Sequence, residues 1–153
     1  MDLRLRITTE LKQAMRDKAA ERLSTLRLIS AAIKDRDIAT RSEGNEEGAT
    51  EAEVLAILGK MVRQRQESAK TYEEAGRIDL AERELSEVKV VEEFLPRQLD
   101  DQETSDAVDA AIAEVGAESI RDMGRVMGAL KEKYTGQMDF GSAGPLVKQK
   151  LSN

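Results

Sequence analysis

The sequence contains no cysteine, no histidine and no tryptophan, and aromatic residues make up only 3% of its 153 residues. Without cysteine the chain has no disulfide and no thiolate metal site. Without histidine it lacks the commonest general base and the commonest transition-metal ligand, so catalysis would rest on Asp, Glu, Lys, Ser, Thr or Tyr. The low aromatic content argues against a β-sandwich, whose strands favour aromatic and β-branched residues.

Long apolar runs are absent too. No stretch approaches the roughly 20 apolar residues that a membrane-spanning helix requires, and residues 1–6 are not followed by the apolar core of a signal peptide. The sequence therefore predicts a cytoplasmic protein without a membrane partner. No Walker-type glycine loop occurs, and adjacent carboxylates such as Glu73 and Glu74 point about 100° apart on a helix. No catalytic residue, metal site or cofactor is predicted.

Charge is distributed unevenly along a chain whose net charge is −6. Residues 1–41 hold 10 Lys or Arg against 6 Asp or Glu, a balance of +4. Residues 42–115 hold 8 against 20, and residues 116–153 hold 6 against 4, which gives balances of −12 and +2. A polyanion would meet the two ends rather than the middle, although the same charges also suit solvated helix surfaces.

Apolar residues at helical spacing predict an all-α fold. The expected helices cover about 2–17, 19–40, 51–75, 79–94, 101–115, 119–136 and 140–151. Ile7, Leu11 and Met15 step by four and form the expected buried stripe of the first helix. The patterns at Thr50 to Glu53 and at Asp100 to Glu103 predict capping boxes, and Gly76 and Gly116 are placed to close helices in the left-handed conformation.

Pro96 ends the fourth helix, because proline lacks an N–H and disfavours helical geometry in the preceding residue. The sequence therefore predicts an N-terminal four-helix domain over residues 1–96 and a C-terminal three-helix bundle over residues 97–153. A bundle of about 55 residues lies near the lower limit for independent stability, so contacts with the first domain or with a partner would help it.

Gly124 and Gly128 stand four residues apart inside the sixth helix, where each glycine costs about 1 kcal/mol relative to alanine. Two interpretations fit. Structurally, the pair lets the fifth or seventh helix pack closely. Functionally, it opens a flat strip where an RNA backbone or a partner helix can approach.

The tail is the other basic part of the chain, and its cations suit phosphate contacts. Arg121 and Arg125 lie one turn apart, whereas Lys148 and Lys150 cannot share a helix face closely. Aromatic residues hardly interleave with these cations, which disfavours a single-strand reader based on base stacking.

Several segments together resemble the GatB/YqeY family over nearly the whole chain. They are 11–15 (LKQAM), 21–27 (ERLSTLR), 75–80 (AGRIDL), 94–99 (FLPRQL) and 122–128 (DMGRVMG), with Gly136. The resemblance implies an all-helical protein with a four-helix first domain and a three-helix tail. The tail is similar to the C-terminal domain of the GatB subunit of glutamine-dependent aminoacyl-tRNA amidotransferase, a region that engages tRNA.

That enzyme is a carbon–nitrogen ligase that amidates Glu-tRNA(Gln) or Asp-tRNA(Asn) with glutamine as amido donor, using ATP and magnesium. Its catalytic core and its amidase subunit have no counterpart here, so the resemblance transfers no active site. It implies a candidate tRNA-facing role for Arg121, Arg125, Lys131 and Lys133. The segment 141–145 (GSAGP) departs from a smooth final helix and puts the start of that helix in question.

Three hypotheses result. The first is a non-catalytic tRNA-binding or accessory protein related to the amidotransferase. The second is a helical protein-interaction module with no RNA role, in which the strip at Gly124 and Gly128 receives a protein of the translation apparatus. The third, a free-standing amidotransferase-type enzyme, is disfavoured because nucleophile, histidine and nucleotide site are all missing.

Overall fold

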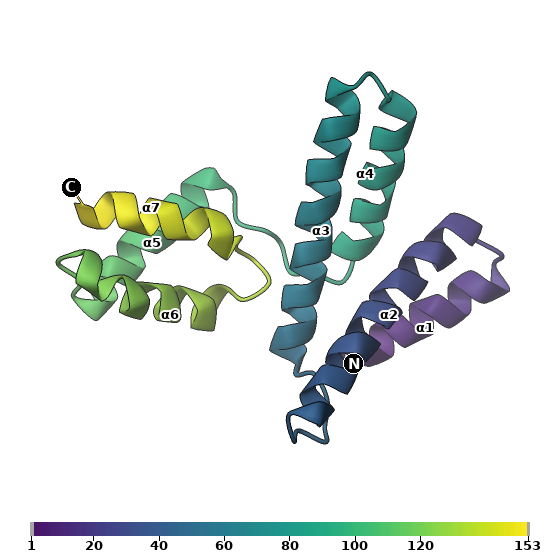
Figure 1. Cartoon of the computed structure of the whole chain (residues 1–153), viewed down its shortest axis with the longest axis horizontal. Coiled ribbons are helices and arrows are strands. Elements are labelled where there is room, and N and C mark those ends of the chain that lie inside the picture. Colours follow the sequence, from purple (N-terminus) through teal and green to yellow (C-terminus); the bar gives the residue numbers. More distant parts are fainter. Residues whose placement is uncertain (1, 153) are drawn as a thin grey trace. The chain divides into compact units, whose positions relative to one another are not determined.

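The computed structural model describes residues 2–152, whose regular structure is entirely helical, with no strand (Figure 1). The α-helices are α1 (Leu3–Arg16), α2 (Ala20–Ser42), α3 (Glu51–Glu74), α4 (Ile78–Glu92), α5 (Asp101–Val115), α6 (Met123–Tyr134) and α7 (Phe140–Ser152). A single 3₁₀ turn, η1 (Ile120–Asp122), leads into α6. The predicted all-α class is confirmed.

The chain divides into two compact units, Met1–Leu95 and Pro96–Asn153. The first contains α1 to α4 and the second contains α5 to α7. That residues 1–96 and 97–153 fold as separate domains stays a prediction.

In the first unit, α1 pairs with α2 and α3 pairs with α4, and α2 also contacts both α3 and α4. Figure 1 shows the two pairs as hairpins of adjacent helices. Their buried seams share one apolar core, whose fully buried members include Ile7, Leu26, Ile29, Val54, Leu58 and Val91. The stripe expected on α1 is wrong at Met15, which is 51% exposed while Ala14 is buried. Each step of four residues rotates about 40° past a full turn, so Met15 lies about 80° away from Ile7.

Local sequence signals set several helix ends. Glu53 and Thr50 exchange backbone and side-chain hydrogen bonds at the start of α3, and Glu103 and Asp100 do so at the start of α5, so both predicted capping boxes are confirmed. Gly76 (φ 76°) and Gly116 (φ 67°) adopt the left-handed conformation expected of them. The seventh helix does begin at Phe140, with Pro145 in its second turn.

A buried carboxylate anchors the far end of the loop between α2 and α3. Asp37 is a buried residue of α2, and its carboxylate accepts two hydrogen bonds from Arg4, at 2.9 and 2.5 Å. The same carboxylate accepts the N–H of Ala49 at 2.8 Å, while Arg4 donates to the Ala49 carbonyl at 2.9 Å. The Arg4 guanidinium lowers the pKa of Asp37 from 3.8 to about 2. Two helices and a loop therefore meet at one ion pair.

In the second unit, α5, α6 and α7 contact one another around a small core. Its buried side chains are Ala107, Val108, Ala111, Val126, Leu130, Met138, Ala143, Val147 and Leu151. The start of α7 is secured by Asp139, whose carboxylate accepts the N–H of Gly141 and the hydroxyl of Ser142, each at 3.0 Å. This cap offsets the glycines and proline that make the segment a poor helix former.

Candidate RNA-facing surface of the tail

One side of α6 combines cations with exposed glycines. Arg121, in the turn η1 that leads into α6, and Gly124, Arg125, Gly128 and Lys131 on α6 are all exposed. Each of the five lies three or four residues from another member of the set. Residues at these spacings lie on one side of a helix, which we call the α6 face. From Arg121 to Lys131 the face extends about 15 Å along the axis.

The two glycines on the α6 face are not covered by the described residues. A Cβ atom at Gly124 or Gly128 would meet no atom within 4 Å. The buried seam of α6 runs through Val126 and Leu130, on the opposite side of the helix. The interpretation that these glycines let α5 or α7 pack closely is therefore wrong. The interpretation as an interface with a partner stays a prediction.

Arg125 is partly neutralised by an acid in the turn that precedes α6. Its guanidinium donates to Asp122 at 3.2 Å. The Asp122 carboxylate also accepts the N–H of Glu118 at 2.9 Å and that of Ser119 at 3.3 Å. These two backbone groups, together with the charge of Arg125, lower the pKa of Asp122 below its ordinary value. Asp122 thus shapes the turn before α6 and positions Arg125.

Arg121 and Lys131 form no ion pair within residues 2–152, so they are the freest cations of the α6 face. Lys133 does not belong to this face. Residues two apart on a helix point about 200° apart, and the Lys133 ammonium lies 5.7 Å from the ring centroid of Tyr134, in a cation–π arrangement. Of the four candidate cations, the fold brings Arg121, Arg125 and Lys131 together and separates Lys133.

The last helix contributes one structural cation and one free cation. Lys150 donates to Asp109 at 2.7 Å and to the Ser105 hydroxyl at 3.0 Å, which ties α7 to α5. Lys148 is exposed and has no ion pair in the described part of the chain. Sequence spacing alone did not distinguish these two lysines, because it does not show which one faces a partner helix.

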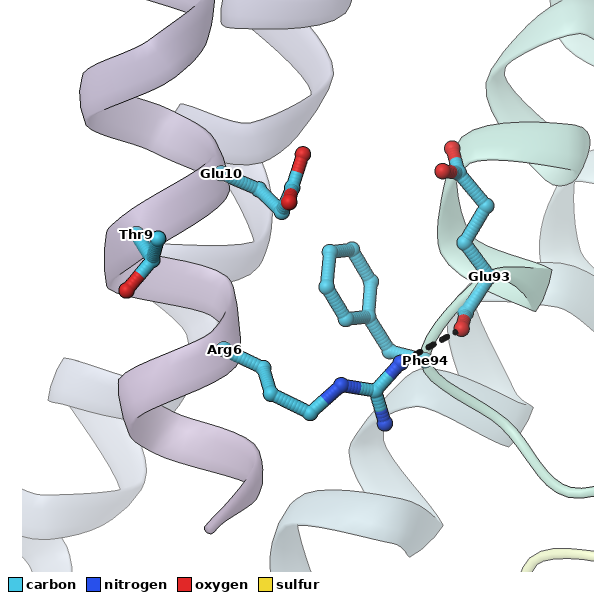
Figure 2. Close-up of a pocket in the computed structure, with 5 residues that line it drawn as sticks. All are labelled: Arg6, Thr9, Glu10, Glu93 and Phe94. Atoms are coloured by element: carbon cyan, nitrogen blue, oxygen red, sulfur yellow. Dashed lines mark hydrogen bonds between the residues drawn. The ribbon is translucent and has the colours of Figure 1, made fainter. Parts of the chain in front are cut away.

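A concave site in the first unit has a different character. It is lined by Arg6, Thr9, Glu10, Glu93 and Phe94 (Figure 2). Arg6 donates to the Glu93 carbonyl at 3.0 Å and lies 5.5 Å from the centroid of the Phe94 ring.

Both carboxylates of this concave site already have a partner. Arg22 binds Glu10 at 2.9 Å and Glu93 at 2.5 Å. Arg22 therefore neutralises both carboxylates and joins α1, α2 and the end of α4. Across residues 2–152, no three acidic side chains gather closely enough to hold a metal ion.

Comparison with known proteins places this geometry in context. The family profile described as "Yqey-like protein" matches residues 4–151. The chain is 35% identical over 89 residues to "Altered inheritance of mitochondria protein 41, mitochondrial" from Clavispora lusitaniae, a match that covers 58% of this chain and 49% of that protein. It is 27% identical over 90 residues to an uncharacterised protein of Schizosaccharomyces pombe, covering 59% and 69% of the two chains.

The aligned part therefore spans about half the length of the first of these relatives. Within residues 2–152, no helix has both the length and the apolar character needed to cross a membrane.

Proposed function

The chain belongs to the YqeY-like protein family, and from this membership we propose that it is a non-catalytic tRNA-binding accessory protein related to the glutamine-dependent tRNA amidotransferases. In this proposal the family link to carbon–nitrogen ligases is one of association, since the chain supplies no active site. The protein acts in the cytoplasm, where it holds the body of tRNA by shape and phosphates without reading bases.

The observation that carries the proposal is the α6 face. Arg121 and Lys131 are free to bind phosphates, and between them the helix backbone is bare at Gly124 and Gly128. Long cationic side chains beside a bare backbone allow a phosphodiester chain to lie close to the helix. The positive balance is small, because Glu132 shares the exposed side and Asp122 pairs with Arg125. The proposal therefore predicts weak binding that depends strongly on salt.

Binding of the full chain to bulk tRNA, measured by fluorescence anisotropy at low and at moderate salt, tests this function. The variant with Arg121→Glu and Lys131→Glu should bind at least about tenfold more weakly at low salt. The slope of log affinity against log salt should fall by about 0.7–0.9 for each phosphate that the variant no longer binds. The matched control is Lys148→Glu, an exposed and unpaired lysine on α7, which should bind as the parent chain does.

Two results would refute the proposal. One is a lack of saturable binding even at low salt. The other is equal weakening by Lys148→Glu and by Lys131→Glu alone, two variants with the same change in charge, because binding would then follow net charge alone. In both cases circular dichroism of each variant establishes that the helices are intact.

A second candidate function is a helical protein-interaction module with no RNA role, and the bare glycines favour it. A helix of a translation protein can approach Gly124 and Gly128 closely, since no side chain intervenes. Such an interface would be apolar and would hold at moderate salt, whereas phosphate binding would not. Binding of a protein partner that persists at moderate salt and survives Arg121→Glu with Lys131→Glu, but is lost on Gly128→Ala, would support this second function. Phosphate binding should instead be lost with the two cations.

A further inference from the structure

The α1–α2 hairpin of the first unit has a second surface that the tail function does not use. A groove of about 300 Å³ runs between the two helices, with the buried side chains of Ile7 and Ile33 among those that line it. Thr8, Ser30 and Ala31 also line it and supply small side chains. Because small residues separate the larger ones, the groove has room for the side chains of another molecule.

Large apolar side chains are exposed on the same two helices. Leu5 and Met15 on α1 are 50% and 51% exposed, and Ile38 on α2 is 53% exposed. The ion pair between Arg4 and Asp37 places the Leu5 end of α1 beside the Ile38 end of α2. Leu5, Met15, Ile38 and the groove residues Thr8, Ala31 and Lys34 form what we call the hairpin face. Exposed apolar residues gathered at a groove mark an interaction site more often than scattered ones do.

The charge around the hairpin face is predominantly positive. Lys12, Arg27 and Lys34 are exposed and form no ion pair within residues 2–152. The one carboxylate that lines the groove, Asp37, is already neutralised by Arg4. Glu21 and Asp35 are the other exposed acids of α2, so the three unpaired cations remain in excess. A ligand that fits this surface therefore combines apolar side chains with negative charge.

We infer that the hairpin face docks an acidic amphipathic helix of a partner protein. From Leu5 to Met15 the face measures about 15 Å, which is close to three turns of a bound helix. A helix in a groove presents apolar anchors at spacings of three, four and seven residues. Its acidic flanks would then meet Lys12, Arg27 and Lys34. RNA fits less well, because the face offers an apolar floor and no aromatic side chain for base stacking.

The test uses the full chain and a fluorescent 18-residue probe peptide. The probe carries leucines at positions i, i+3, i+4 and i+7 on one side and glutamates on the other. A scrambled peptide of the same composition is its control. Saturable binding of the probe but not of the scrambled peptide is expected, and Lys34→Glu should weaken it. No saturable binding of the probe up to ~1 mM would overturn the inference.

A matched pair of variants locates the site. Ile38→Gln should weaken probe binding about tenfold, as the loss of a buried apolar anchor commonly does. Ile78→Gln on α4 should have no effect, although Ile78 is also 53% exposed. Both substitutions remove an apolar side chain that is mostly in water, so neither should unfold the protein. Equal effects of the two substitutions would place the peptide elsewhere and refute the inference.

Other occupants give their own signatures. Concentration-dependent self-association, detected by light scattering and abolished by Ile38→Gln, would assign the face to a second copy of this chain. Loss of tRNA binding in Lys34→Glu, with probe binding unchanged, would assign it to RNA. Either result overturns the inferred partner. Because Arg121→Glu in the tail should not alter probe binding, failure here is distinguishable from failure of the proposed tRNA function.

Discussion

Gly48 offers a sharp test of how the first unit is held together. Its φ is +82°, and a Cβ at this position would lie 2.6 Å from Oδ1 of Asp37. Gly44, in the same loop, has φ +97° and nothing within 4 Å. Replacing each glycine by alanine therefore separates the cost of backbone conformation from the cost of displacing the Asp37 carboxylate.

The expected losses in the free energy of unfolding differ by the strength of the hydrogen bond between Asp37 and the Ala49 N–H. Alanine in a left-handed conformation destabilises the folded state by about 1–2 kcal/mol. Alanine also restricts the unfolded chain more than glycine does, which stabilises the protein by about 0.4–1 kcal/mol. Gly44→Ala should therefore lower the free energy of unfolding by about 0.5–1 kcal/mol. Gly48→Ala should in addition displace Asp37 from the Ala49 N–H, and a hydrogen bond to a charged group is worth about 1.5–3 kcal/mol. Its total cost should be about 2–4 kcal/mol.

Urea unfolding of the first unit measures this difference. The chain has two tyrosines and no tryptophan, so in a Tyr134→Phe background the fluorescence of Tyr72 on α3 reports the first unit alone. A lower midpoint with an unchanged slope indicates lost stability. If Gly44→Ala and Gly48→Ala have equal effects, contact with Asp37 does not constrain the loop. In an Asp37→Ala background the excess cost of Gly48→Ala should vanish, as expected for coupled neighbours.

Three further outcomes test the charged groups of the fold. The pKa of Asp37 is lowered from 3.8 to about 2 in the folded protein. The stability that Asp37 contributes is therefore complete above pH ~4 and is lost as the pH falls toward 2. Asp37→Asn should flatten this dependence of the free energy of unfolding on pH, measured by urea titrations at pH 2 to 6. Lys150→Met should lower the stability of the tail in thermal unfolding by about 0.5–1 kcal/mol, whereas Lys148→Met should leave it unchanged. Equal effects would mean that the ion pair between Lys150 and Asp109 does not hold α7 to α5. Asp122→Asn should free Arg125 and steepen the salt slope of tRNA binding by about 0.7–0.9, and an unchanged slope would mean that Arg125 does not contact phosphate.

The helices could be predicted from the sequence because their signals are local. Apolar spacing located the seven helices, and the pairs at Thr50 and Asp100 fixed two helix starts through neighbours three residues away. The start of α7 was harder to predict, since Asp139 compensates for unfavourable residues that follow it. A cap of this kind overrides propensity without changing the hydrophobic pattern.

Contacts between distant residues could not be predicted in the same way. Arg4 and Asp37 are 33 residues apart, and nothing in the spacing of charges identifies them as partners. The interpretation of Gly124 and Gly128 as packing residues failed for a related reason. Periodicity shows which residues share a helix side, but it does not show whether a neighbouring helix covers that side. The basic residues of the tail differ in their partners, which the spacing does not show. Asp122 binds Arg125, Asp109 binds Lys150, and the Tyr134 ring lies beside Lys133.

The short segment after Pro96 has a practical consequence for dividing the chain. Leu99 donates its N–H to the Gln137 carbonyl at 2.9 Å, Gln98 donates to the Gly136 carbonyl, and Arg97 binds Glu103. These residues precede α5, yet Leu99 and Gln98 are hydrogen-bonded to the loop that joins α6 and α7, and Arg97 is paired with the first turn of α5. A tail fragment begun at the first residue of α5 would lack all three ties. A tail meant for separate study should begin at or before Pro96, so that these residues stay with it.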